Sequence, residues 1–158
     1  MKRHIYLALV IIMVLSLALV ACGGGAPKID WELSITGAVS KPLTLTYQDL
    51  AKREFVTLSD VLMQKSQGED TTNSWEGPSL AALFQEAGVS ADAKTITATA
   101  SDGYAMEMSM GDLGDAIIAL KRDGEWTTSE KNGPIRIVVP GKPANHWLFQ
   151  LVEIEVVE

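Results

Sequence analysis

The sequence predicts an α+β domain with a mainly β core, in which mixed sheets are joined by a few short helices. Three observations predict this class. Short runs of alternating apolar and polar residues recur after residue 28, turn-forming pairs such as Asp123-Gly124 separate them, and only Leu80 to Ala87 shows a clear helical spacing. We expect about eight short strands and two or three short helices, with no internal repeat.

The first 28 residues predict export and a membrane anchor. Residues 1–21 start with Lys2 and Arg3 and continue as an apolar stretch, which is the composition of a signal peptide. Leu19-Val20-Ala21-Cys22 resembles the lipobox of bacterial lipoproteins, which implies a lipidated Cys22 and a location in the bacterial cell envelope, outside the cytoplasm. The alternative is an uncleaved N-terminal membrane helix. The glycines of residues 22–28 predict a flexible tether, and residues 29–158 form one domain.

Composition excludes several classes of function. Without Lys2 and Arg3 the net charge is near −9 rather than the −7 of the whole sequence, so nucleic acid is not an expected partner. Cys22 is the only cysteine, and its lipidation would leave no thiolate for a metal and no cysteine nucleophile. His146 is the only histidine after the signal peptide, so a monomer has no multi-histidine metal site. A serine hydrolase would need His146 beside a serine and an acid, and no G-x-S-x-G motif supports one.

The first half of the domain predicts these elements in order. Ile29 to Thr36 alternates as a half-buried strand, and Leu43 to Thr46 pairs back onto it. A short helix follows over Tyr47 to Arg53, with Thr46 as its N-cap, because threonine oxygens accept from the free amides of a first helical turn. The chain then continues as a strand from Glu54 to Leu62 and as a polar loop from Gln64 to Ser74.

The second half begins with the clearest helix, which starts near Pro78 and stops at Gly88. Two strands then flank the tight turn Ser101-Asp102-Gly103. The remaining predicted elements are strands over Thr95 to Ala100, Tyr104 to Met110, Ala116 to Lys121, Ile135 to Val139 and Val152 to Val157, and a helical turn over Trp147 to Leu151.

Two clusters of side chains have both a functional interpretation and a purely structural one. Tyr104, Met106, Met108 and Met110 fall on one strand face, where methionines could hold Cu(I), but a buried face explains the same spacing. The acidic cluster could offer a carboxylate pair for glycoside hydrolysis, but a solvated helix start is the expectation in so acidic a chain. That cluster consists of Glu107, Asp112 and Asp115.

Arg136 is a single charge inside an apolar strand. In an extended strand it lies on the face opposite to Ile135, Ile137 and Val139. If both faces are covered, its guanidinium must meet a carboxylate, a phosphate or carbonyl groups, because an unpaired buried charge is costly. Three interpretations stay open: an internal pair with a carboxylate such as Asp102, a solvated face, or a contact with a ligand.

A set of short motifs follows in order along the domain. The sharpest is Gly133 to Gly141 (GPIRIVVPG). The others are Trp75-Glu76-Gly77, Leu80 to Gly88, Ser101-Asp102-Gly103-Tyr104, Asp123-Gly124 and Trp147 to Val156. Taken together, these motifs resemble the molybdopterin-binding domain of the sulfite oxidase family over roughly residues 43 to 158. The resemblance implies a compact mixed fold of β-sheets with short helices and, in catalytic members, a molybdenum pyranopterin held in a cleft.

The resemblance also implies a site and a departure from it. The implied contacts with molybdopterin, another pterin or another anion are Asp102, Tyr104, Arg136, Lys142, Asn145 and His146. Catalytic members supply a cysteine thiolate to molybdenum from the segment before W-x-G, where this sequence has Ser59 and Asp60. Compared with the enzymes, the loop from Gly141 to Trp147 is also short.

Three hypotheses follow. The first is a lipid-anchored binding module that holds a small anionic ligand or meets an envelope redox partner, without cysteine-ligated molybdenum. The second is a molybdopterin-dependent oxidoreductase in which Ser59, Asp60 or solvent replaces the cysteine. The third is a partner-docking domain with no cofactor, so enzymatic activity stays open.

Overall fold

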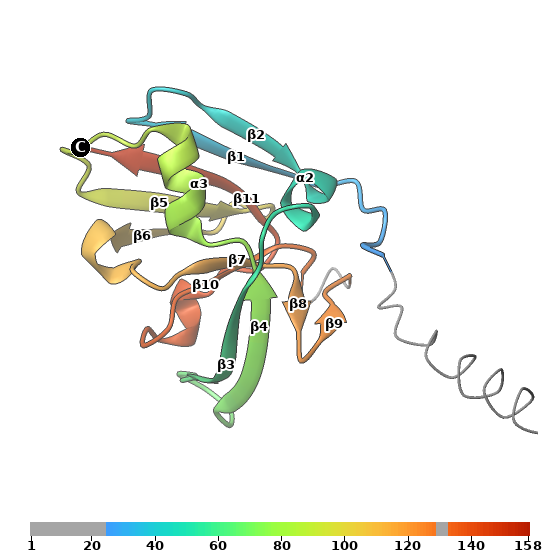
Figure 1. Ribbon diagram of the computed structural model, residues 1–158. Helices are drawn as coiled ribbons and strands as arrows, with labels where there is room; N and C mark the ends of the chain where they lie inside the picture. The colour runs from blue at the N-terminus through green and yellow to red at the C-terminus, as the bar shows by residue number, and fades with distance from the viewer. Residues whose placement is uncertain (1–24, 129–132) are drawn as a thin grey trace, which may run out of the picture.

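The computed structural model describes residues 25–128 and 133–158, and its largest element is a mixed five-stranded sheet (Figure 1). The strand order is β2-β1-β11-β5-β6. Its strands are β1 (Glu32–Gly37), β2 (Leu43–Thr46), β5 (Thr95–Ala100), β6 (Ala105–Ser109) and β11 (Leu151–Val157). β1 and β11 run parallel, whereas the other neighbours are antiparallel. The last strand of the chain therefore lies at the centre of this sheet.

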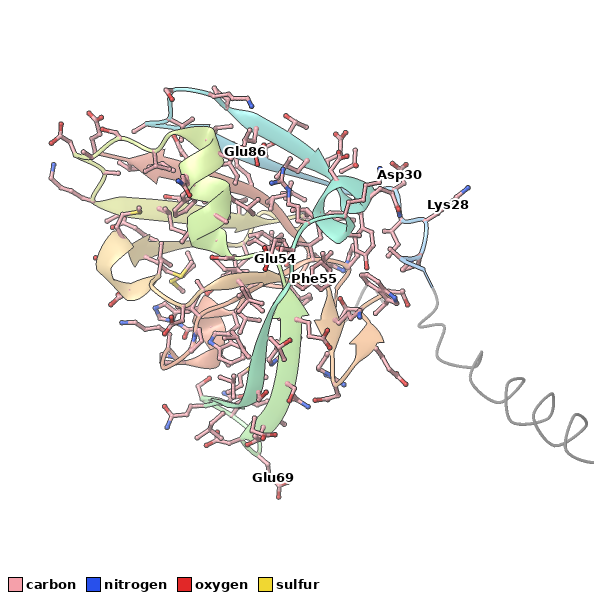
Figure 2. All side chains as sticks on the ribbon, viewed as in Figure 1. Lys28, Asp30, Glu54, Phe55, Glu69 and Glu86 are labelled. Atoms are coloured by element: carbon pink, nitrogen blue, oxygen red, sulfur yellow. The ribbon has the colours of Figure 1, made fainter. Side chains whose placement is uncertain are left out.

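A second sheet has the order β3-β4-β8-β9, and a two-stranded sheet joins β10 to β7. Figure 1 shows β3 and β4 extending as a long hairpin, with Glu69 at its far end in Figure 2. The bounds are β3 (Val56–Met63), β4 (Thr71–Gly77), β7 (Ile117–Ala119), β8 (Lys121–Arg122), β9 (Glu125–Trp126) and β10 (Arg136–Val138). Every residue of β7 and β10 is buried, so this small sheet lies within the core.

Helix α2 (Tyr47–Ala51) begins with a capping box. The Thr46 hydroxyl accepts from the amide of Asp49, and the Asp49 carboxylate accepts from the amide of Thr46. Helix α3 (Leu80–Ala87) ends at Gly88, whose φ of 63° is the left-handed conformation that glycine adopts without strain. Two single 3₁₀ turns, η2 (Met110–Asp112) and η3 (Ala144–His146), complete the helical content of the described residues.

The core brings distant segments into contact at Gly77. A side-chain Cβ at this position would come within 2.0 Å of the Ile118 carbonyl oxygen, so only glycine lets β4 approach β7 this closely. The side chain of Trp75, two residues before Gly77 on β4, is also buried in the core. It packs edge-on against Trp147, with 6.2 Å between the ring centroids. This packing sets the end of β4 beside β10 and the C-terminal segment.

The predicted class of fold, α+β with a mainly β core, is confirmed, and two local predictions were wrong. Residues 71–74 were expected to belong to a polar loop, but they begin β4 because they pair with the end of β3. The helical turn expected from Trp147 to Leu151 lies earlier, at η3, where Pro143 with φ −60° and ψ 159° precedes it as the N-cap.

The predicted signal peptide over residues 1–21 and the predicted lipidation site at Cys22 lie outside the described residues. Within residues 25–128 and 133–158, no helix has both the length and the apolar composition that crossing a membrane requires.

Candidate functional site

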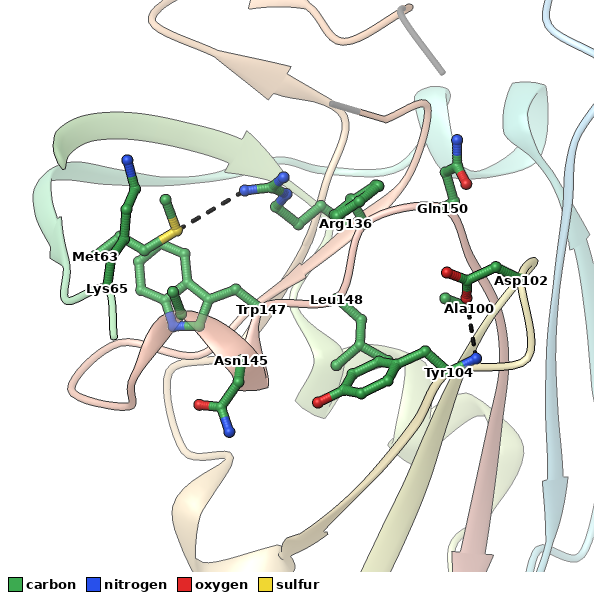
Figure 3. Close-up of a pocket in the computed structure, with 12 residues that line it drawn as sticks. Met63, Lys65, Ala100, Asp102, Tyr104, Arg136, Asn145, Trp147, Leu148 and Gln150 are labelled. Atoms are coloured by element: carbon green, nitrogen blue, oxygen red, sulfur yellow. Dashed lines mark hydrogen bonds between the residues drawn. The ribbon is translucent and has the colours of Figure 1, made fainter. Parts of the chain in front are cut away.

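A cavity of about 370 Å³ lies beside β10 (Figure 3). The β3–β4 hairpin, the β5–β6 turn, and the segment from η3 to β11 also contribute to its wall. Its apolar lining residues are Met63, Ala100, Ala144, Trp147, Leu148 and Phe149. Its polar and charged ones are Lys65, Asp102, Tyr104, Arg136, Asn145 and Gln150. Small-molecule sites have this volume and this mixture of apolar walls with a few polar groups.

Arg136 is the buried charge of this cavity, with 8% of its surface exposed. Its Nη1 donates to the Met63 sulfur at 3.9 Å, which is a weak acceptor, and its Nε is buried without a hydrogen-bond partner among the described residues. Figure 3 shows the guanidinium directed toward Met63. A buried guanidinium with so few acceptors is unusual, because buried polar groups are almost always hydrogen-bonded.

Two aromatic rings hold the guanidinium. Its carbon lies 5.1 Å from the ring centroid of Trp75 and 5.4 Å from that of Phe149. These contacts are within the range of cation–π attraction. Burial, followed by repulsion from Arg122, lowers the pKa of Arg136 to about 10, so it stays cationic near neutral pH. The site therefore has a positive charge that the protein positions and that no described residue neutralises.

No carboxylate lies within 4.0 Å of Arg136 in the part of the chain that the structure describes. The internal pair with Asp102, one of the open interpretations, is not formed. The Asp102 carboxylate instead accepts from the backbone amide of Tyr104 at 2.9 Å, within its own turn. The solvated-face interpretation is also wrong, because the side chain is buried.

The structure brings four of the six predicted contact residues to the cavity, namely Asp102, Tyr104, Arg136 and Asn145. The other two, Lys142 and His146, do not line it. The Lys142 ammonium forms an ion pair with the Asp112 carboxylate at 2.8 Å. His146 Nδ1 lies 3.0 Å from the Asn145 side-chain oxygen.

The methionine stripe packs mainly into the core. Met108 is 2% exposed, and Met106 and Met110 are partly buried against the core, whereas Tyr104 is 48% exposed and belongs to the cavity wall. The buried-face interpretation of the three methionines is therefore confirmed. Of the acidic cluster, Asp112 lies exposed in the single turn of the 3₁₀ helix η2, where its carboxylate pairs with Lys142.

The positions implied for a replacement metal ligand lie away from the cavity wall. Ser59 and Asp60 are exposed and sit at a register shift between β3 and β4, where Asp60 has φ 50°. Within residues 25–128 and 133–158, no three His, Cys, Asp or Glu side chains gather as a metal site. Arg136 is the described residue of this cavity that fits an anionic group.

The sequence did not predict the residues that surround the Arg136 guanidinium. Trp75 and Phe149 lie within motifs of the family resemblance but were not predicted as contacts, and Met63 was not predicted to have any role, yet these three contact the guanidinium. The sequence offered only a weak indication of these contacts, namely one arginine in an apolar strand and several tryptophans elsewhere in the chain. Assigning those contacts required the three-dimensional arrangement, because the segments are far apart in sequence.

The family model described as "Oxidoreductase molybdopterin binding domain" matches residues 23–158. Among curated proteins, the chain is 26% identical over 172 residues to an NADH nitrate reductase of Volvox carteri, covering 85% of this chain and 20% of that protein. It is 24% identical over 159 residues to an NADH nitrate reductase of Ulva prolifera, covering 75% and 18%. The chain thus spans about a fifth of the length of these relatives.

Among solved structures, the chain resembles the sulfane dehydrogenase SoxCD from Paracoccus pantotrophus. The TM-score is 0.74 at 24% sequence identity, over 84% of this chain and 40% of that one. At this identity the similarity concerns the fold.

Proposed function

The chain belongs to the oxidoreductase molybdopterin-binding domain family, and from this premise we propose that it is a binding module that holds a small anionic ligand without cysteine-ligated molybdenum. The observation that carries the proposal is Arg136. It is a buried cation that lines the cavity, has an unpartnered Nε and meets no described carboxylate. A bound anion would supply the missing charge and acceptors.

The composition of the chain supports the absence of thiolate-ligated molybdenum. Its only cysteine is Cys22, which lies far in sequence from Ser59 and Asp60, the positions where the resemblance implies the metal ligand. For a pterin, Arg136, Lys65 and Asn145 offer donors in the cavity wall. A pterin-bound metal would add redox chemistry, and within the described residues no three His, Cys, Asp or Glu side chains gather as a metal site.

We place this module in the bacterial cell envelope, held by lipid on Cys22. The support is the lipobox-like sequence before that cysteine and the glycine-rich segment after it. A ligand or redox partner in the envelope would then meet the cavity outside the cytoplasm.

The test is to produce the full chain in a bacterial host that makes molybdenum cofactor. The purified protein is assayed for molybdenum by mass spectrometry and for pterin by fluorescence, beside an Arg136→Met variant. Arg53→Met is the matched control, because Arg53 is ion-paired with Glu86 and does not line the cavity.

We expect molybdenum well below one atom per chain, and any bound pterin or other anion to be lost in the Arg136→Met variant but kept in the control. Stoichiometric molybdenum would contradict the proposal and favour an oxidoreductase with another metal ligand. A wild-type protein that binds no anion of any kind would instead favour a docking domain.

A further inference from the structure

Arg136 Nε, Trp75 Nε1 and Thr71 Oγ1 are buried and have no hydrogen-bond partner among the described residues, and of these three residues only Arg136 lines the cavity. They belong to one neighbourhood. Met63 accepts from Arg136 and pairs across the hairpin with Thr71, and the Trp75 ring stacks on the guanidinium. Thr71 and Trp75 are four residues apart on β4, so they share one face of the strand. In the cavity wall itself, Arg136 offers N–H donors and has only the Met63 sulfur as a described acceptor, which favours a ligand group that brings oxygen atoms.

The remainder of the cavity favours an apolar body. Trp147 and Leu148 are almost fully buried and form part of the wall. Figure 3 shows Leu148 between the Arg136 side and the Tyr104 side of the cavity, with Trp147 and Asn145 along another side. A ligand that reaches from Arg136 toward Tyr104 therefore passes apolar surface before it meets polar groups again.

The charges of the lining favour a single negative charge. Arg136 and Lys65 are cations and Asp102 is an anion, so the lining has a net charge of +1. Arg122, which also acts on Arg136, is paired with Asp123 at 3.8 Å. A phosphate monoester carries about −1.5 to −2 near neutral pH, whereas a carboxylate carries one charge on two oxygens that match the planar donor edge of arginine.

We propose that the cavity binds an organic monocarboxylate with an aromatic or aliphatic body. This inference rests on the proposed anion-binding function and names its ligand class. The carboxylate pairs with Arg136, and the body lies against Trp147 and Leu148. The Phe149 ring, which is 42% exposed and stacks on the guanidinium, shifts to admit the carboxylate.

The experiment titrates the full chain with four probes and follows binding by calorimetry. Benzoate has the charge and the body, benzamide has the body without the charge, inorganic phosphate has charge without the body, and phenyl phosphate has the body with a second charge. We expect benzoate to bind at least about tenfold more tightly than each of the other three. Arg136→Met should lower benzoate affinity at least tenfold and leave benzamide unchanged, while Arg53→Met changes neither.

Each other outcome has a distinct meaning. Equal binding of benzamide and benzoate would overturn the role of charge, and tighter binding of either phosphate would overturn the monocarboxylate class while leaving anion binding intact. A wild-type chain that binds none of the four, and also carries no pterin, would overturn the proposed function itself. If Arg136→Met does not fold, the ranking of the four probes on the wild-type chain still decides.

Discussion

Arg136 lies between the buried ring of Trp75 and the exposed ring of Phe149, and it faces no carboxylate among the described residues. Taking a guanidinium out of water is costly, and cation–π contacts recover only about 0.5–2 kcal/mol each. The ligand-free protein therefore holds this charge at a cost to its own stability. A buried charge with such a cost is more consistent with binding than with packing.

The first prediction concerns that cost. Replacing Arg136 by methionine, which is apolar and of similar length, should leave the free energy of unfolding unchanged or raise it by about 1 kcal/mol in the ligand-free protein. Urea denaturation followed by tryptophan fluorescence measures this. Arg122→Met, at an exposed position, should change stability by less than about 0.5 kcal/mol. A loss above about 2 kcal/mol in Arg136→Met would show that the arginine is mainly structural.

The second prediction concerns Tyr47, which is fully buried and whose hydroxyl has no hydrogen-bond partner among the described residues. Burial raises the pKa of Tyr47 to about 12 from an ordinary value of 10.0. The folded state thus keeps its proton where the unfolded state loses it, and this contribution to stability is complete below pH 10 and is lost as the pH rises toward 12.

Tyr47→Phe should remove this pH dependence. The difference in unfolding free energy between wild type and variant should therefore change by about 2 kcal/mol between pH 9 and pH 12, with the wild type losing more. Urea titrations at a series of pH values measure it. Parallel curves for the two proteins over that range would show that the phenol ionises in the fold as easily as in water.

At the scale of elements, β4 approaches β7 closely at Gly77, where a Cβ would lie 2.0 Å from the Ile118 carbonyl oxygen. Gly77→Ala should separate these strands and cost at least about 3 kcal/mol, because backbone must move to admit the methyl group. Gly114→Ala is the matched control, since a Cβ there meets no atom within 4 Å. Thermal unfolding of the two variants compares them, and equal melting temperatures would contradict the packing described.

Elements with local causes could be predicted from the sequence. Thr46 and Gly88 bound α2 and α3 as expected, because capping depends on residues only a few positions away. The start of β4 at Thr71 could not be predicted, since polar residues there join a strand only by pairing with β3. Local chemistry specified the ends of helices, while partner strands decided the ends of β-strands.

The candidate site was predictable in part for the same reason. Arg136 was marked by its place in an apolar strand, the Asp102 turn by its motif, and Asn145 by its place in the short loop between two motifs. Lys142 was also predicted as a contact, but it does not line the cavity and pairs with Asp112, which lies thirty residues earlier. The rings around Arg136 come from β4 and the segment before β11, and no local pattern brings these together.

At the scale of the whole molecule, the domain is proposed to be tethered to a membrane through Cys22. Replacing Cys22 by serine should move the protein from the membrane fraction to the soluble fraction, because lipid on that residue supplies the attachment. Ultracentrifugation of cell extracts, with immunodetection of the full chain, measures the distribution. A Cys22→Ser protein that stays with membranes would show that another segment holds it there.

The central claim is that the buried guanidinium of Arg136 binds an anionic ligand. Its most direct test is the ¹H–¹⁵N NMR signal of the Arg136 Nε–H group in protein labelled at arginine, assigned with the Arg136→Met variant and titrated with benzoate. The account predicts a saturable downfield shift of that signal, with the Arg53 signal unchanged. An Arg136 signal that does not respond at saturating benzoate or phosphate would contradict it.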